Sequence, residues 1–381
     1  MSKVHITLVG GQPTPVYQGV LLSNPDKIIL LCSPGKHGTQ ELANTIQENL
    51  GTMHYYNVRI ESVVIDDVQA ITDKLNILFA SIPAEDELSI NISSGTKIWS
   101  VLCAQLCPRP DAHIYCLAQN GKVLTTQGYC EEKQVEFDMF MQFNLLQHPL
   151  ENYTLFSKYT DQETRNQQTI ERLYQTKGFH PLLKKMIVEY NQDKDHYLRS
   201  DQSVEIDDNY IDWHADAQVF VIKLGEIYEE IGGKYASSML LNTGWFEYEV
   251  ASMLAEIYGK QNVYTNCIFK SINQQDKNEV DVIVHTGQKL LFVECKTKIQ
   301  NSTDIDKFHS VVKNYGGNGS KALFITMHEM DTIQQEKCND NHIHHTCTYH
   351  RMDVRGEKMM VRTTSTMLKQ QIQEFIDYAN Y

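Results

Sequence analysis

The chain has 381 residues, of which 41% are hydrophobic and 22% charged, a composition typical of a globular protein long enough for two domains. Its formal net charge is −14 and both halves are acidic, which excludes binding of duplex DNA through overall positive charge. The cysteines lack the spacing of a disulfide framework, and neither a signal peptide nor a membrane-spanning apolar run is evident, so we expect a cytoplasmic protein with no membrane partner.

Short apolar strands alternate with helices in the first third of the chain. After an N-terminal strand, strand patterns occur at 27–33, 61–66, 87–93, 111–119 and 122–127. Helical spacing occurs between them at 37–51, 68–82 and 96–107. Such alternation predicts an open, mostly parallel α/β sheet, and ligands of such sheets bind beyond the carboxyl ends of the strands.

Loops rich in Gly, Ser and Thr follow three of these strands, at 10–15, 33–39 and 91–97. Small residues let the backbone approach a ligand, and helix N-termini offer free N–H groups to anions. The loops therefore predict a phosphate-binding face, although tight turns between strands and helices would have the same composition. None of them is a P-loop or a GxGxxG fingerprint.

The segment NISSGTK at 91–97 resembles the N-x-[ST]-[GS]-G-T-[KR] motif of CARF domains, Rossmann-like sensors of type III CRISPR immunity that dimerise and bind cyclic oligoadenylates. Ser94 departs from the glycine that is commoner at its position. The resemblance implies a CARF ligand-sensing domain over 1–146, a homodimer, and a cyclic oligoadenylate, usually cyclic tetraadenylate, as activator. The ligand-binding residues implied by the motif and by the other two loops are Gly11, Gln12, Pro13, Thr14, Ser33, Lys36, His37, Asn91, Ser93, Ser94, Gly95, Thr96 and Lys97.

The middle of the chain loses the alternation of strands and helices. Helical stretches occur around 161–175 and 181–190, and the run 193–209 is charged and poor in apolar residues. We predict a helical and charged connector over 147–210, with 193–209 exposed, and a C-terminal domain over 211–381.

The stretch NEVDVIVHTGQKLLFVECKTK at 278–298 predicts a β-hairpin with a two-residue turn that begins at Gly287. If Thr286 pairs with Lys289, Asp281 lies opposite Glu294 on one face. Like charges in that position repel each other, and a divalent cation would turn the repulsion into affinity. Lys296 faces the same side and could position a metal-bound water.

A further carboxylate comes from a helix predicted over 242–259. Glu247 is flanked by the apolar stripe of this helix, whereas Glu249 points to a more polar side. We therefore predict that Glu247 is the acid that faces inward.

A helix Glu followed by Asp-x(12)-Glu-x-Lys on consecutive strands resembles the core of PD-(D/E)xK nucleases, and a helix at 303–317 and a strand at 321–327 continue the likeness. Val280 stands where the family often has proline. The resemblance implies that Asp281, Glu294 and the Cys295 main-chain carbonyl bind Mn²⁺ or Mg²⁺, that Glu247 completes the shell directly or through water, and that Lys296 positions the attacking water. The alternative is a purely structural role, in which two strands carry an edge salt bridge from Lys296 to Glu279 or Asp281.

The fold class predicted for the chain is α/β, with an N-terminal Rossmann-like CARF domain on a mostly parallel sheet and a C-terminal PD-(D/E)xK, restriction-endonuclease-like α/β domain. The combination resembles homodimeric nucleases of type III CRISPR defence that cyclic oligoadenylates activate and that cut DNA or RNA with a divalent metal. A sensing scaffold with an inactive nuclease domain, or an enzyme that degrades its own cyclic ligand, are the alternatives. The His- and Cys-rich run 342–347 is interpreted as a polar loop because its spacing fits no usual zinc site.

Overall fold

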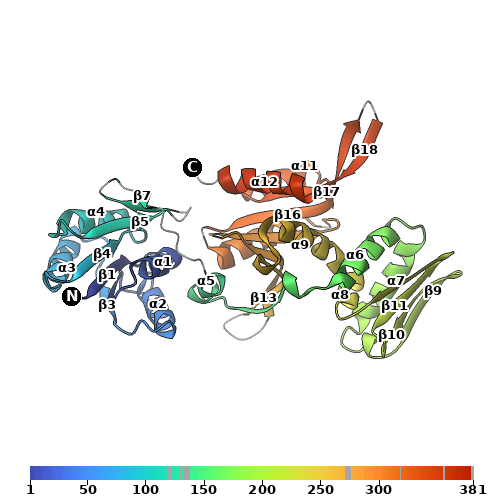
Figure 1. Cartoon of the computed structure of the whole chain (residues 1–381), viewed down its shortest axis with the longest axis horizontal. Helices are drawn as coiled ribbons and strands as arrows, with labels where there is room; N and C mark the ends of the chain where they lie inside the picture. The colour runs from blue at the N-terminus through green and yellow to red at the C-terminus, as the bar shows by residue number, and fades with distance from the viewer. Residues whose placement is uncertain are drawn as a thin grey trace.

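The computed structural model describes residues 1–118, 122–126, 128, 130–131, 138–270, 276–287, 289–299, 301–317, 319–354 and 357–378. Three sheets lie in this part of the chain (Figure 1). No helix in the described ranges is both long and apolar enough to span a membrane.

The first sheet has the order β3-β2-β1-β4-β5-β6-β7. Its first five strands are parallel, and β6 and β7 add antiparallel pairs at one edge. The strands are β1 (Lys3–Leu8), β2 (Lys27–Cys32), β3 (Val58–Ser62), β4 (Glu87–Asn91), β5 (His113–Leu117), β6 (Val123–Thr125) and β7 (Cys130–Glu131). The mostly parallel sheet predicted for the N-terminal region is confirmed.

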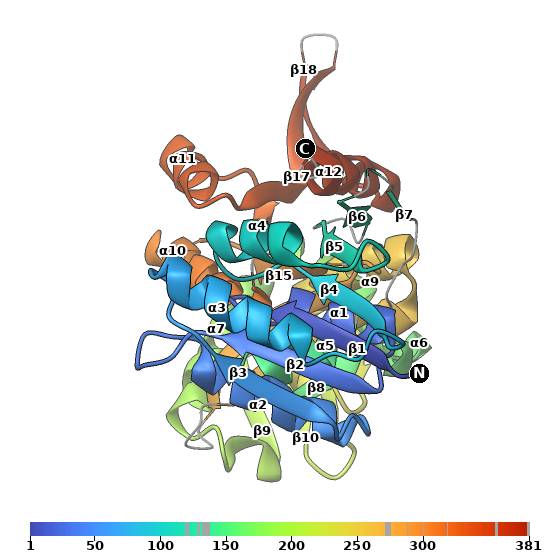
Figure 2. The same ribbon diagram turned by 90° about the vertical axis from the view of Figure 1, so that its left-hand side faces the viewer.

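Helices cover both faces of this sheet, which Figure 2 views together with its helices. Alternate residues of β2 explain the arrangement: Ile28 and Leu30 pack under α1 and α2, whereas Ile29 and Leu31 pack under α3 and α4. The helices are α1 (Thr14–Ser23), α2 (Gln40–Thr52), α3 (Val68–Ala80) and α4 (Lys97–Leu106). The chain leaves β1 towards β2 on one side and meets β4 on the other, so a ligand crevice is expected at the carboxyl ends of β1 and β4.

The second sheet is antiparallel, with the order β12-β11-β10-β9, and packs against α6 and α7 in the largest hydrophobic cluster. Its strands are β9 (Gln202–Ile206), β10 (Asn209–His214), β11 (Val219–Leu224) and β12 (Ile227–Gly232). The helices around it are α6 (Asp161–Tyr174), α7 (Phe179–Gln192), η2 (Tyr197–Arg199) and α8 (Ala236–Leu241). The run 193–209, expected to be an exposed connector, thus contains η2, β9 and the start of β10, because Val204 turns into the core.

The third sheet has the order β18-β17-β16-β15-β14-β13-β8. Its strands are β8 (Leu150–Leu155), β13 (Val263–Lys270), β14 (Asp276–His285), β15 (Leu290–Lys296), β16 (Lys321–His328), β17 (His344–Val354) and β18 (Glu357–Arg362). β8 comes from far earlier in the chain and pairs with β13. In Figure 1 the strands β17 and β18 extend beyond the rest of the sheet. The run 342–347, interpreted as a polar loop, largely belongs to β17, where Cys347 is buried.

Helices pack on both faces of this third sheet. α9 (Gly244–Tyr258) and α12 (Ser365–Tyr378) contribute to the cluster on one face. α5 (Met139–Leu145), α10 (Thr303–Val311), the π-helix η4 (Val312–Gly316) and α11 (Thr332–Asp340) contribute to the cluster on the other. The short helices η1 (Phe156–Lys158) and η3 (Lys260–Asn262) flank β8 and β13.

Candidate functional site

The β14–β15 hairpin has the predicted register. Val282 pairs with Val293 and Ile283 with Phe292, and the Thr286 N–H donates to the Lys289 carbonyl at 3.0 Å. Gly287 has a φ of +101°, which suits the first central position of the turn. Gln288, the second central residue, lies outside the described residues.

Asp281, Glu294 and Lys296 meet where the paired part of the hairpin ends. The Cys295 N–H donates to Asp281 Oδ2 at 2.7 Å. Lys296 Nζ lies 2.6 Å from Glu294 Oε1 and 3.5 Å from Asp281 Oδ2. We call this arrangement the acid–lysine fork. It brings together the three side chains that the pairing arithmetic predicted on one face.

Glu247 reaches the fork from the first turn of α9. Burial raises the pKa of Glu247 well above its usual value, and the charge of Asp281 raises it further. Burial and Asp281 likewise raise the pKa of Glu294, to about 7, although Lys296 acts in the opposite sense. The carboxylates are therefore close enough to oppose one another's ionisation.

The Lys296 ammonium is held in its charged form. Burial alone would lower the pKa of Lys296, but the carboxylates of Asp281 and Glu294 outweigh it and raise the pKa. A charged ammonium donates hydrogen bonds and stabilises negative charge, and it does not take a proton from water.

Glu279 is a fourth carboxylate at the fork, which the sequence reasoning considered only as a salt-bridge partner for Lys296. Burial raises its pKa, and so does the nearby charge of Asp281. The sequence could have indicated that Glu279 lies at this site, because Glu279 is two residues before Asp281 in the same strand and alternate residues of a strand share a face.

The donor set fits a hard divalent cation. Four carboxylates face a single ammonium, and oxygen ligands with excess negative charge are what Mg²⁺ and Mn²⁺ prefer. Among the described residues, no three His, Cys, Asp or Glu side chains already stand together as an assembled metal site. Asp281 and Glu294 contact the Lys296 ammonium instead, which offsets part of their repulsion.

Glu249 is not on the more polar side of α9, as the sequence suggested. Its side chain is only 5% exposed, and its Oε1 accepts from Arg362 Nη2 at 2.8 Å. The same guanidinium group lies 3.0 Å from Glu171 of α6. The buried Glu249 therefore belongs to an ion cluster that joins α9, α6 and β18 through the half-exposed Arg362, whereas Glu247 lies at the fork.

The three predicted ligand loops lie side by side at the carboxyl ends of β1, β2 and β4. The Gly10 N–H donates to Ser94 Oγ at 3.0 Å, and Ser94 Oγ donates to the Gln12 carbonyl at 3.3 Å. The serine that departs from the CARF motif thus links two of the loops. A side chain at position 10 would collide with the backbone of Gly95, which explains the glycine there.

Several predicted ligand residues brace the loops internally. Asn91 donates to the Pro15 carbonyl at 2.8 Å, Ser93 accepts from the Leu117 N–H at 2.7 Å, and Thr96 caps α4 through the Trp99 N–H. The remaining predicted residues form a second group. Ser33 hydrogen-bonds to Thr39 of its own loop, Pro13 is the buried N-cap of α1, and Gln12 and Thr14 are half-buried.

The exposed members of the predicted set face outward at the same end of the sheet: Gly11, Lys36, His37, Gly95 and Lys97. Gly95 has a φ of +82°, which lets the loop turn into α4. Two lysines beside a helix N-terminus form a surface suited to an anionic ligand.

Two family models match the chain. The "Card1 CARF domain" matches residues 4–147, and the "Card1-like, endonuclease domain" matches residues 234–347. No curated protein matches the sequence at a significant level.

Solved structures share the fold of almost the whole chain. Can2 from Sulfobacillus thermosulfidooxidans, in complex with cyclic tetra-adenylate, is 16% identical over 98% of this chain and 99% of its own, with a TM-score of 0.69. Protein VC1899 from Vibrio cholerae is 14% identical over 99% of this chain and 97% of its own, with a TM-score of 0.70. A type III CRISPR defence DNA nuclease activated by cyclic oligoadenylate is 15% identical over 87% of this chain and 46% of its own, with a TM-score of 0.55.

Sequence identities this low show only that the fold is shared, whereas the two family models identify the two domains. The two models together match more than half of the residues, in the order that the sequence motifs predict. The chain therefore has a Card1-type CARF domain followed by a Card1-like endonuclease domain.

Proposed function

We propose that the protein is a metal-dependent endonuclease of type III CRISPR defence that cyclic tetraadenylate activates. The acid–lysine fork at the end of the β14–β15 hairpin is the observation that carries the proposal, because it lies inside the matched endonuclease domain and holds the residues that phosphodiester hydrolysis needs. The activator is proposed from the CARF match and from the similar fold of Can2, whose structure contains cyclic tetra-adenylate.

For the nuclease centre, we assign Asp281, Glu294 and the Cys295 main-chain carbonyl as ligands of Mn²⁺ or Mg²⁺, with Glu247 completing the shell directly or through water. When bound, the cation supplies charge neutralisation at the scissile phosphate. The Lys296 ammonium orients the attacking water and stabilises the charge that develops on phosphate oxygens, a role that its raised pKa favours over proton removal. The substrate is DNA, RNA or both, inside the cytoplasm.

For the sensor, we assign the phosphates and riboses of the ligand to the exposed backbone and lysines of the three loops, foremost Lys36 and Lys97. Two copies of the chain bind one cyclic ligand across their two-fold axis. Ligand binding turns the two nuclease domains relative to each other and forms the substrate cleft. Structures of the whole dimer with and without ligand test this point, since superposable dimers would reject it.

The first experiment measures cleavage of supercoiled plasmid, single-stranded DNA and single-stranded RNA in Mn²⁺, with and without cyclic tetraadenylate. Cutting that requires the ligand supports both halves of the proposal and names the substrate. Cutting that ignores the ligand rejects the sensor half, and no cutting with any ring size rejects the nuclease half.

Matched variants assign the result to the two sites. Glu294→Ala abolishes cutting and leaves ligand binding intact, whereas Glu256→Ala, an exposed acid on α9, leaves both unchanged. Lys97→Ala weakens ligand binding, and Lys3→Ala, an exposed lysine at the other end of the same sheet, does not. Retained cutting by Glu294→Ala would refute the assignment of the centre.

A further inference from the structure

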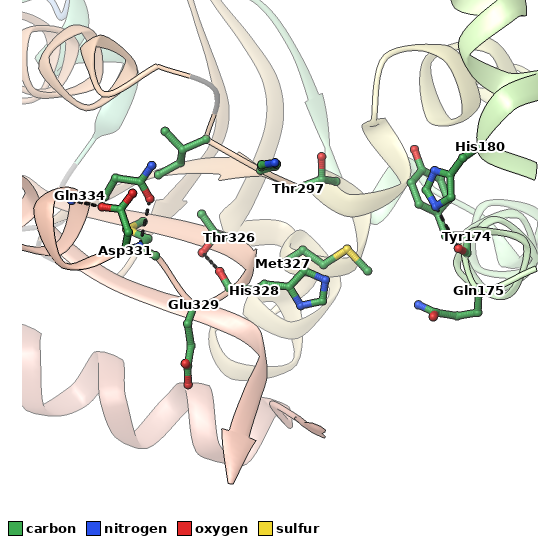
Figure 3. Close-up of a pocket in the computed structure, with 13 residues that line it drawn as sticks. Tyr174, Gln175, His180, Thr297, Thr326, Met327, His328, Glu329, Asp331 and Gln334 are labelled. Atoms are coloured by element: carbon green, nitrogen blue, oxygen red, sulfur yellow. Dashed lines mark hydrogen bonds between the residues drawn. The ribbon is translucent and has the colours of Figure 1, made fainter. Parts of the chain in front are cut away.

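A pocket of about 790 Å³ opens between the α6–α7 turn and the end of β16 (Figure 3). One wall is the end of α6 and the start of α7, with Tyr174 and His180. The facing wall is the end of β16, with Met327 and His328, and Figure 3 shows these side chains directed across the space towards Tyr174 and His180. The volume lies within the range of pockets that hold small organic ligands.

The pocket begins where β15, the strand that carries Glu294 and Lys296, ends. Thr297 and Lys298, which line it, directly follow Lys296, and Thr326 on the opposite wall pairs with Lys296 in the parallel ladder. Lys298 is two residues beyond Lys296, in the bend that follows the strand, so the pocket lies next to the end of β15 that carries the fork.

α6 contacts α9, the helix that carries Glu247. The Tyr174 ring packs on Trp245 of α9, with ring centroids 4.8 Å apart, and Glu247 is two residues further along that helix. The α6–α7 wall is thus fixed to the helix that carries one of the fork's carboxylates, although α6 and α7 lie outside both family matches.

The lining suits a flat, partly polar ring system. Ile299 and Met330 are buried and give the pocket an apolar floor, and Met327 of the facing wall is buried as well. His180 and His328 are exposed at its mouth. The His180 ring lies 5.0 Å from the Tyr174 ring and the His328 ring 5.9 Å from the Tyr349 ring, between centroids, so each extends an aromatic surface on which a base can stack.

The two acids of the lining are turned away from the space or engaged elsewhere. In Figure 3 the Glu329 side chain points away from His180, and its carboxylate accepts from the Arg351 N–H at 3.2 Å. Asp331 caps α11 by accepting from the Gln334 N–H at 2.8 Å. Lys298 is exposed and remains the cation of this lining that can meet a phosphate.

The hollow continues past the pocket. A neighbouring hollow of about 420 Å³ shares Gln175 and His328 with it and is lined further by Arg172 and Tyr349. An extended strand that leaves the pocket along α6 therefore meets the Tyr349 ring next, whereas the Arg172 guanidinium pairs with Glu229 and the lining also holds Glu171.

We propose that this pocket, given the nuclease function proposed above, receives one unpaired nucleotide of the substrate strand next to the scissile phosphate. Its base lies on the apolar floor between Tyr174, His180 and His328, and its phosphate meets Lys298. A paired base carries its partner strand and does not fit between the two walls, so the pocket selects strands whose bases are free at this position.

The test separates base recognition from cleavage. In a Glu294→Gln background, fluorescence anisotropy with cyclic tetraadenylate and Mn²⁺ present measures the affinity for a short oligothymidylate and for an abasic chain of the same length. We expect tighter binding of the oligothymidylate, and we expect His180→Ala combined with His328→Ala to reduce that preference about tenfold, the effect of losing one stacked base. His214→Ala, an exposed histidine of β10, is the matched control.

An unchanged preference in the double variant, or an equal loss of affinity for both chains, overturns the pocket. His328→Ala alone repeats the test without disturbing the α6–α7 turn, where His180 Nε2 contacts the Tyr174 carbonyl at 3.1 Å. If binding depends on the base but the wild-type protein never cuts, the proposed nuclease function is rejected and the base-binding pocket stands. Ligand-dependent cutting with no base-dependent binding would do the reverse.

Discussion

Glu294→Gln should make the protein more stable while it abolishes cleavage. The substitution keeps the shape of the side chain, which is 16% exposed, and removes its charge. In the wild type, burial and then the charge of Asp281 raise the pKa of Glu294 from its usual 4.5 to about 7, even with Lys296 alongside. Ionising this group in the folded protein is therefore costly.

Proton linkage gives the sign and the size of the effect of Glu294 on the free energy of unfolding. Between pH 4.5 and 7 the folded protein holds this proton more tightly than the unfolded chain does, so stability falls as the pH rises. The loss is complete above the folded pKa and amounts to about 3 kcal/mol. In the absence of divalent cations, Glu294→Gln should recover this free energy above pH 7 and recover almost none of it near pH 4.5.

Urea unfolding of the full chain in a chelator, at about pH 5 and about pH 8, measures the difference. Glu256→Gln, on the exposed side of α9, controls for loss of a surface charge. Added Mn²⁺ should stabilise the wild type and leave Glu294→Gln almost unchanged, because a ligand stabilises only the state that binds it. If Glu294→Gln were no more stable than the wild type at pH 8, burial and repulsion at the fork would not govern stability there.

Three other predictions concern the two domains and their contact. Lys296→Met should lower the rate constant of single-turnover cleavage by about 100-fold or more, since the ammonium stabilises developing charge. Lys307 is an exposed lysine of α10, and the Lys307→Met variant should cut normally. Gln142, whose Nε2 donates to the Gly316 carbonyl at 2.5 Å, joins α5 to the nuclease domain. Gln142→Ala should lower the ratio of ligand-stimulated to basal cutting several-fold, because about 1 kcal/mol of hydrogen bonding between the domains is lost. The ligand affinity measured by calorimetry should not change. An unchanged ratio would exclude this route of coupling. Burial, then the charge of His113, lowers the pKa of His5 to about 3, so the CARF domain should lose about 2 kcal/mol of stability between neutral pH and pH 5 as the unfolded His5 takes up its proton. His5→Gln should flatten that pH dependence in thermal unfolding, and an unaltered slope would assign it to other groups.

Local patterns predicted much of the fold. The strands and helices from β2 to β6 follow from apolar runs and turn residues that lie next to one another in the chain, and the structure has them within a few residues of the predicted ranges, whereas no range was predicted for α1. The register of the β14–β15 hairpin follows from a two-residue turn, so the meeting of Asp281, Glu294 and Lys296 was predictable by counting.

Contacts between distant segments decided the rest. β8 joins the edge of the third sheet beside β13, and the run around Val204 enters a core, although neither segment has a strong pattern of its own. Glu249 was expected on a polar face because its neighbours on α9 are polar, but its side chain is buried and pairs with Arg362, 113 residues later.

The sequence by itself determined the order of the two domains, the three ligand loops and the hairpin that holds Asp281, Glu294 and Lys296, because each depends on residues that are neighbours along a strand, a helix or a turn. Only the tertiary structure decided which further groups surround them. Glu279 joins the predicted Glu247 there, both with pKa values raised by burial and by other carboxylates, and Tyr174 and His180 come to face β16 across a pocket. Burial, repulsion and cavities arise from packing between segments that no local pattern connects.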